Sequence, residues 1–218
     1  MKFDCVVFDM DGTLTDSQPL WRKTWLEILH EHGVKARMSD LAFMVQMELP
    51  ESAYAISHDF PTGITQQEAI DLAVARMTRY YAESVPLKPG ARELLLELRR
   101  RGVVCCLGTA SVEERFMPML RRLQVDSLLD HIVTTAQVGK NKHHPDIFLE
   151  AARRAGTTPG RTVVIEDTLY CLKTAQKAGF LTLGVEEPAS EGTPEEVSAL
   201  CDWFIHDFTQ MPESFWQD

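Results

Sequence analysis

The sequence lacks the features that mark secreted, membrane-spanning and nucleic-acid-binding proteins. Its opening residues, MKFDCVVFDMDG, hold an apolar run that is too short for a signal-peptide core and is bounded by acidic residues. No later segment approaches the roughly 20 apolar residues that a membrane-spanning helix needs. We therefore expect a cytoplasmic protein that has no membrane partner.

Cysteine is scarce and has no informative spacing. The chain has five cysteines, an odd number, and none of them forms a CxxC pair. A disulfide framework or a structural zinc site would need paired and spaced cysteines. We expect these residues to be buried thiols: Cys5, Cys105, Cys106, Cys171 and Cys201.

Positive charge is also in short supply. The chain has 22 lysines and arginines against 32 aspartates and glutamates, which gives a net charge of -10. Nucleic acids and anionic membranes are polyanions that bind basic surfaces, so this balance argues against both as partners. A small anionic substrate would need a local cluster of donors or a metal ion.

Short apolar runs alternate with helical patterns along most of the chain. The run Cys5-Val6-Val7-Phe8 stops at Asp9 and is typical of a buried parallel strand. This rhythm predicts an α/β fold with a doubly wound parallel sheet, whose ligands gather at the carboxyl ends of the strands. Further strands are expected at residues 103–107, 131–135, 162–165, 180–185 and 203–205, and helices at residues 91–101, 112–123, 145–155 and 168–178.

The rhythm breaks between residues 17 and 85, where helical patterns occur without a convincing strand. Thr65 and Glu68 have the spacing of a capping box, and the helix that they open places Ala69, Ala73, Met77 and Tyr80 on one face. We expect an all-helical insertion over residues 17–85 and a core made of residues 1–16 and 86–218. Proline at both crossings suggests the hypothesis that the insertion swings as a lid.

The strongest chemical signal is the run Asp9-Met10-Asp11-Gly12-Thr13, directly after the first predicted strand. One acid can attack phosphorus while the other gives a proton to the leaving oxygen, and Gly12 permits a sharp turn. A calcium loop is the alternative interpretation, but its twelfth position would need a glutamate and is Leu20.

Three more motifs follow in order: Thr109-Ala110 after the second core strand, Lys142 before Pro-Asp, and Glu166-Asp167 after a further strand. With DxDGT first, this series resembles the haloacid dehalogenase superfamily over nearly the whole chain. His143 stands where many relatives have proline, Lys140 is a nearby competitor for the lysine role, and Cys171 replaces a glycine.

The resemblance implies a phosphatase acting on a small phosphorylated metabolite of the sugar or sugar-alcohol phosphate class. Asp9 would be the nucleophile and Asp11 the general acid and base, while Thr109, the Ala110 amide and Lys142 would hold phosphate. Mg²⁺ would be bound by Asp9, the Asp11 carbonyl and Asp167, and by Glu166 directly or through water.

Two other functions stay open. A β-phosphoglucomutase shares all four motifs, but sequences of that kind have a histidine where this chain has Trp21, and they carry a Gly-x-x-Arg loop that is missing here. The second open function is that of a non-catalytic binding protein on the same fold.

Trp21 is a candidate substrate contact, although tryptophan at helical spacing is more often part of a core. The sequence specifies no oligomeric state, and we expect a monomer.

Overall fold

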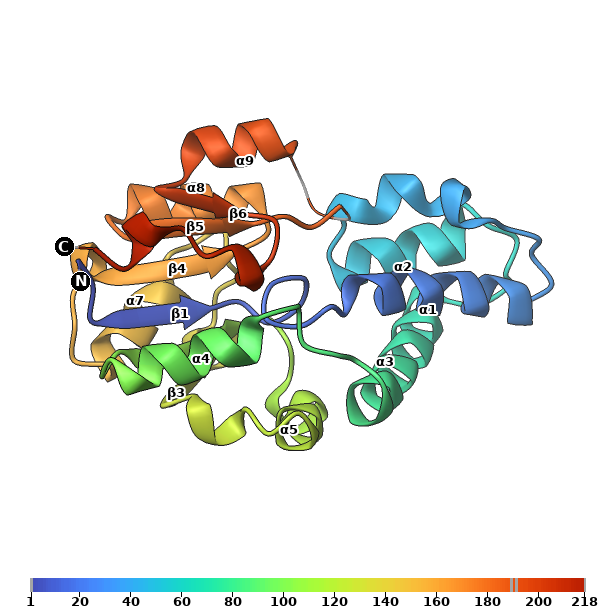
Figure 1. Ribbon diagram of the computed structural model, residues 1–218. Coiled ribbons are helices and arrows are strands. Elements are labelled where there is room, and N and C mark those ends of the chain that lie inside the picture. Colours follow the sequence, from blue (N-terminus) through green and yellow to red (C-terminus); the bar gives the residue numbers. More distant parts are fainter. Residues whose placement is uncertain (1, 189, 191, 218) are drawn as a thin grey trace. The chain divides into compact units, whose positions relative to one another are not determined.

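The computed structural model describes residues 2–188, 190 and 192–217 (Figure 1). The chain divides into two compact units, one made of Met1–Asp16 and Pro86–Asp218 and the other of Ser17–Val85. We call them the α/β unit and the helical unit. Among the described residues, no helix is both long enough and apolar enough to cross a membrane.

A parallel sheet forms the centre of the α/β unit, with strand order β3-β2-β1-β4-β5-β6. Every neighbouring pair of strands is parallel, which is the pattern of a doubly wound α/β fold and confirms the predicted fold class. The strands are β1 Cys5–Phe8, β2 Val104–Thr109, β3 His131–Thr134, β4 Thr162–Glu166, β5 Leu181–Val185 and β6 Trp203–Ile205.

Helices cover both faces of this sheet (Figure 1). Side chains of α7 and α8 form one buried cluster with Cys5 and Val7, which point to the same face of β1. On the opposite face, the ring of Phe8 lies 6.2 Å from the ring of Phe208 in η4, and α4 contacts β2. The helices of this unit are α4 Ala91–Arg100, α5 Glu113–Arg122, α6 Thr135–Val138, α7 Asp146–Arg154, α8 Leu169–Lys177 and α9 Pro194–Leu200, with short 3-10 turns η2 Asp126–Leu128, η3 Pro159–Arg161, η4 Phe208–Gln210 and η5 Glu213–Phe215.

The predicted strands all occur, with small shifts at their ends. The strand expected at residues 103–107 runs on to Thr109, and the strand expected at residues 162–165 includes Glu166. Both extensions place a candidate site residue at the last position of a strand. Four predicted helices match α4, α5, α7 and α8, whereas α6 and α9 were not predicted because they are short.

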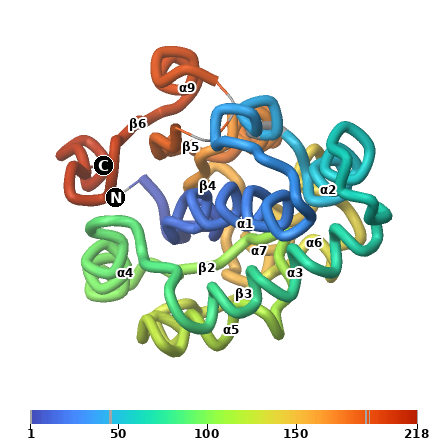
Figure 2. Tube along the Cα trace, turned by 90° about the vertical axis from the view of Figure 1, so that its right-hand side faces the viewer, coloured from blue at the N-terminus to red at the C-terminus, as the bar shows by residue number. Residues whose placement is uncertain are grey.

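The helical unit consists of α1 Gln18–Glu31, η1 Met38–Gln46, α2 Leu49–His58 and α3 Gln66–Glu83, traced from blue to blue-green in Figure 2. Its core joins α1, α2 and α3 through Trp25, Ile28, Ile56 and Ala73. The predicted capping box is present, since the Thr65 hydroxyl accepts a hydrogen bond from the Glu68 amide.

The predicted inner face of α3 was wrong at one position. Tyr81 is buried with Ala69, Ala73 and Met77, whereas Tyr80 is partly exposed and its hydroxyl donates to Glu27 at 2.9 Å. An i+4 step from Met77 leads to Tyr81, and an i+3 step leads to Tyr80. Tyr81 therefore packs in the apolar core, and Tyr80 makes a polar contact nearer the surface.

The segments of the α/β unit that lead to and from the helical unit run side by side. Thr15 and Leu87 form an antiparallel bridge, and the Asp16 amide donates to the Pro86 carbonyl at 3.0 Å. The Lys88 amide donates to the Leu14 carbonyl at 3.0 Å. The segment after the helical unit is therefore bonded directly to the end of the DxDGT loop.

Candidate active site

The candidate site lies where the strand order reverses, between β1 and β4. β1 is followed along the chain by β2 on one side, whereas its other neighbour, β4, begins the second half of the sheet. Phe8 pairs with Ile165, so Asp9, which follows β1, and Glu166, the last residue of β4, lie side by side. Ligands of doubly wound sheets bind at this kind of switch point.

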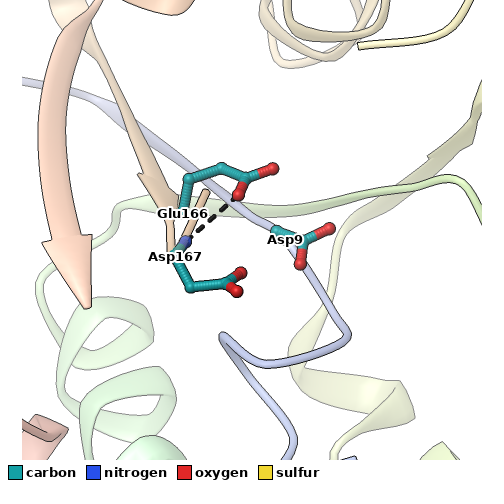
Figure 3. Close-up of side chains that lie close together, drawn as sticks. All are labelled: Asp9, Glu166 and Asp167. Atoms are coloured by element: carbon teal, nitrogen blue, oxygen red, sulfur yellow. Dashed lines mark hydrogen bonds between the residues drawn. The ribbon is translucent and has the colours of Figure 1, made fainter. Parts of the chain in front are cut away.

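Three acidic side chains meet there (Figure 3). One carboxylate oxygen from each of Asp9, Glu166 and Asp167 lies within 4.8 Å of the others. Their residues are 8%, 1% and 2% exposed, so water contributes little to their solvation. Burying carboxylates is costly unless they are paired or bind a cation, which marks the cluster as a site built for a purpose other than folding.

Lys142 is the cation that the structure places against this cluster. Its ammonium donates to the Asp9 carboxylate and, at 2.8 Å, to Glu166 Oε1. The Lys142 side chain is almost fully buried. Lys140, the competing lysine, is half exposed and pairs with Asp146 at 3.1 Å. The structure therefore brings together Asp9, Lys142, Glu166 and Asp167.

Burial and the neighbouring charges shift the pKa values of the groups in this cluster. Burial, reinforced by the charges of Glu166 and Asp167, raises the pKa of Asp9 despite the opposing effect of Lys142. Burial and the Glu166 charge raise the pKa of Asp167 to about 7. Burial works to lower the pKa of Lys142, but Asp9 and Glu166 outweigh it and hold that pKa well above its ordinary value. One ammonium does not balance three carboxylates.

Hydrogen bonds from neighbouring loops orient two of the acids. Glu166 Oε2 accepts the backbone amides of Asp167 and Thr168, both at 3.1 Å, and the first of these bonds is drawn in Figure 3. Asp167 Oδ1 accepts the Thr13 hydroxyl at 2.8 Å, and Asp167 Oδ2 accepts the Ser190 hydroxyl. Both oxygens of the Asp167 carboxylate are thus held by hydroxyl groups.

Asp11 lies in the turn that follows Asp9, outside the group of three acids. Gly12 has a φ of 87°, in the left-handed region that glycine tolerates best, and the Thr15 amide donates back to the Met10 carbonyl at 2.9 Å. The carboxylate of Asp11 accepts the Ser111 hydroxyl at 2.9 Å. The second acid of DxDGT is therefore joined to the loop after β2.

Thr109 and Ala110 form that loop. Thr109 ends β2 and is buried, and its hydroxyl oxygen accepts the Ser111 amide at 3.0 Å. Its hydroxyl proton takes no part in that bond. Ala110 is exposed directly after it. Ser111 therefore links the expected phosphate loop to Asp11.

His143 and Cys171, the two residues that differ from the family pattern, both pack against neighbouring side chains. The ring of His143 stacks on Tyr170 with centroids 4.1 Å apart, next to Lys142. Cys171 is buried on the inner face of α8, in the cluster that contains Cys5 and Cys106. The five cysteines are free, as predicted, and all but the partly exposed Cys201 are buried.

Trp21 lies in α1 of the helical unit, where it packs against that unit's own core. Trp21 is partly buried there, and a substrate contact stays a prediction. The hydroxyl donors Thr13, Ser111 and Ser190 were missed by sequence reasoning. Thr13 stands inside the DxDGT motif and Ser111 directly follows Thr109-Ala110, but Ser190 is separated from Asp167 by the whole of α8 and β5, and no spacing could identify it.

The cluster suits a hard divalent cation. Asp9, Glu166 and Asp167 offer only carboxylate oxygen, which Mg²⁺ prefers, and the group contains no cysteine or histidine that would favour zinc. Burial first, and then the charges of the neighbouring acids, raise the pKa values of Asp9 and Asp167, so a bound cation would offset the cost of keeping these carboxylates ionised. The residues present fit Mg²⁺.

Comparison with known protein families agrees with this geometry. The family model of haloacid dehalogenase-like hydrolases matches residues 3–179, most of the chain. The protein belongs to the haloacid dehalogenase-like hydrolases. The matched range includes the acid cluster, Lys142 and the loop after β2.

Relatives with assigned activities cover nearly the same length. The chain is 26% identical to hexitol phosphatase B of Escherichia coli K12, over 94% of this chain and 92% of the relative. It is 27% identical to a phosphorylated carbohydrates phosphatase of Thermotoga maritima, over 87% and 88%. A solved family hydrolase from Deinococcus radiodurans R1, with bound phosphate and sodium, is 27% identical, has a TM-score of 0.79 and covers 98% of this chain and 95% of that one.

Proposed function

We propose that this hydrolase is a Mg²⁺-dependent phosphatase of small organic phosphate monoesters, of the sugar or sugar-alcohol phosphate class. The observation that carries the proposal is the buried cluster of Asp9, Lys142, Glu166 and Asp167 at the junction of β1 and β4. The similarity to the hexitol and carbohydrate phosphatases supports the substrate class.

In the proposed reaction, an Asp9 carboxylate oxygen attacks phosphorus in line and forms a phospho-aspartate as the bond to the leaving oxygen breaks. Asp11 gives its proton to that oxygen. Asp11 then takes a proton from water, which attacks the phospho-aspartate and releases phosphate. This assignment makes Asp9 the nucleophile and Asp11 the general acid and base.

The phosphoryl oxygens need positive charge and hydrogen-bond donors, because phosphoryl transfer depends mainly on positioning and electrostatic stabilisation. Lys142 supplies the charge, and the Thr109 hydroxyl and the Ala110 amide supply donors on the other side. The Ser111 bond to Asp11 keeps the general acid beside that loop. These residues are the proposed phosphate site.

Mg²⁺ would be held by Asp9, the Asp11 carbonyl, Asp167 and Glu166, the last directly or through water. When bound, the ion offsets the negative charge of the acids and the phosphate. Lys142 bonds to two of the three acids, Asp9 and Glu166, and its single positive charge does not balance all three. The helical unit is proposed to act as a cap, with Trp21 as a candidate substrate contact.

The test is release of inorganic phosphate from a panel of hexitol, sugar, glycolate and nucleotide phosphates, with Mg²⁺ and then with excess chelator. We expect release from sugar or sugar-alcohol phosphates that stops in chelator and returns when Mg²⁺ is added. Release that persists in chelator would contradict the metal assignment.

The panel also separates hydrolysis from phosphoryl transfer between positions on a sugar. A β-phosphoglucomutase would convert β-glucose 1-phosphate to glucose 6-phosphate with little free phosphate. We expect phosphate release instead, and isomer formation without release would favour the mutase. A protein that turns over no ester but binds sugar phosphates would favour a non-catalytic role.

A further inference from the structure

The segment after β5 contributes to the acid cluster although it carries none of the family motifs. We call it the β5 loop; its described residues are 186–188, 190 and 192. The Ser190 hydroxyl donates to Asp167 Oδ2, and the Ser190 amide donates to the Glu187 carbonyl at 2.9 Å. The side chain that reaches Asp167 is therefore fixed by a turn that begins at Glu187.

The Asp167 carboxylate accepts hydrogen bonds at both of its oxygens. Thr13, from the loop after β1, donates to Oδ1 at 2.8 Å, while Ser190 donates to Oδ2. A carboxylate held at both oxygens has one preferred plane, and hydrogen bonds to a ligating carboxylate hold it in the orientation for its metal. Ser190 therefore has the position of a residue that orients a metal ligand.

Lys88 anchors the other end of this turn. Its ammonium donates to Glu187 Oε2 at 2.8 Å and to the Glu186 carbonyl at 3.2 Å. The Lys88 and Glu187 side chains are only 8% and 5% exposed, so the pair is buried and its geometry is held tightly. The Lys88 amide also donates to the Leu14 carbonyl. Lys88 thus joins the loop that carries Thr13 to the β5 loop that carries Ser190.

We propose that Ser190 and Lys88 are positioning residues of the metal site. Ser190 orients the Asp167 carboxylate toward the cation, and Lys88, through Glu187, holds the β5 loop in the place from which Ser190 acts. This inference rests on the proposed function, because it assumes that the acid cluster binds Mg²⁺. It adds to that function two residues outside the four motifs.

The first experiment is calorimetric titration of Mg²⁺ into the metal-free protein. We expect Ser190→Ala to raise the Kd for Mg²⁺ by about tenfold or more, the range found for residues that support metal ligands. Ser190→Thr keeps the hydroxyl and should stay within about threefold of the wild type, a span below that range. Ser198→Ala, on the exposed face of α9, is the matched control and should bind like the wild type.

Activity gives a second measurement of the same effect. The Mg²⁺ concentration for half-maximal phosphate release should rise in Ser190→Ala by the same factor as the Kd, while kcat at saturating Mg²⁺ stays within about twofold, since the supporting residue acts on metal binding. A Kd in Ser190→Ala within twofold of the wild type would overturn the role of Ser190. A wild-type protein that binds no Mg²⁺ would instead overturn the proposed function on which the inference rests.

Lys88 is tested by a variant for which electrostatics and positioning predict opposite changes in the affinity for Mg²⁺. Lys88→Gln removes a positive charge near the cluster, and this loss alone would tighten binding of a cation. Positioning predicts weaker binding, because the β5 loop loses its anchor. Unchanged or tighter Mg²⁺ binding by folded Lys88→Gln would overturn the role of Lys88.

Removing one partner of a buried ion pair can prevent folding, so a second variant is needed. The double variant Lys88→Gln/Glu187→Gln removes both charges and leaves the net charge unchanged. We expect it to fold, as checked by thermal unfolding, and to bind Mg²⁺ several-fold more weakly than the wild type. Wild-type affinity in the folded double variant would overturn the anchoring role of the pair.

Discussion

The two units of the protein treat charged side chains in opposite ways. In the helical unit, Arg76 of α3 bonds to Glu27 and Glu31 of α1 at 3.2 and 2.6 Å, with both glutamates partly exposed. In the α/β unit, Lys142 bonds to Asp9 and Glu166, two members of a cluster of three buried acids. In the first cluster the glutamates are open to solvent, which weakens the ion pairs that link the two helices. The second is costly for folding and marks a functional site.

The buried cluster also depends on where the strands end. Asp9 follows β1, Glu166 is the last residue of β4 and Asp167 follows it, so the backbone of the sheet holds the three acids together. The helical unit is held by apolar contacts among α1, α2 and α3. We therefore expect changes in the α/β cluster to affect chemistry and metal binding, and changes in the helical core to affect stability first.

Among the variants that leave Asp9 in place, the largest effect is expected from Lys142→Ala. Removing the ammonium leaves the phosphoryl group without its protein cation, and loss of one strong electrostatic donor lowers kcat by about 100- to 1,000-fold. Steady-state phosphate release with saturating Mg²⁺ measures this. Lys140→Ala removes an exposed lysine two residues away and serves as the matched control. Equal losses in both variants would show that net charge, not the buried contact, matters.

The helical unit provides the converse variant. Ile28 is fully buried in its core, and Ile28→Ala should lower the free energy of unfolding by about 2–5 kcal/mol. Urea unfolding measures the loss. Mg²⁺ binding at temperatures where the variant is folded should match the wild type, because the side chains of the acid cluster belong to the α/β unit. Loss of Mg²⁺ affinity in folded Ile28→Ala would break the distinction between the units.

A smaller effect is expected from the pH dependence of stability in chelator. The folded-state pKa of Asp167 is about 7, above its ordinary value of 3.8, so the folded protein binds this proton more tightly than the unfolded chain. Its contribution is fully present below about pH 4 and is lost as pH rises through about 7.

Asp167→Asn removes this titration. Its stability relative to the wild type should rise between pH 4 and pH 8, by up to a few kcal/mol. Thermal unfolding of both metal-free proteins across this range measures the difference. A difference that is flat with pH, or falls, would contradict the raised pKa.

Much of the α/β unit could be predicted because its signals are local. Apolar runs that end within two residues of Asp9, Thr109 and Glu166 identify buried parallel strands, and parallel strands bring their carboxyl ends to one edge. The choice of Lys142 over Lys140 followed from its place in the Lys-x-x-Pro-Asp pattern. The structure places Lys142 in a buried position against Asp9 and Glu166, and Lys140 in an exposed one beside Asp146.

The sequence was less informative where partners lie far apart or where patterns are weak. The predicted inner face of α3 included Tyr80 because adjacent tyrosines fit almost the same helical stripe. α2 was not delimited, since its buried face contains small residues, Ser52, Ala53 and Ala55, that give little periodic contrast. Ser190 and Lys88 reach the site through tertiary contacts that no local pattern encodes.

The most direct test of the account is phosphate release by Asp9→Asn beside the wild type and the exposed control Asp59→Asn, with the preferred ester and saturating Mg²⁺. Asparagine keeps the size of the side chain but removes the nucleophilic carboxylate. The account predicts a fall of at least about a thousandfold in Asp9→Asn, with normal folding, and wild-type turnover in Asp59→Asn. Turnover by purified Asp9→Asn at the wild-type rate would contradict the assignment of Asp9 as the nucleophile.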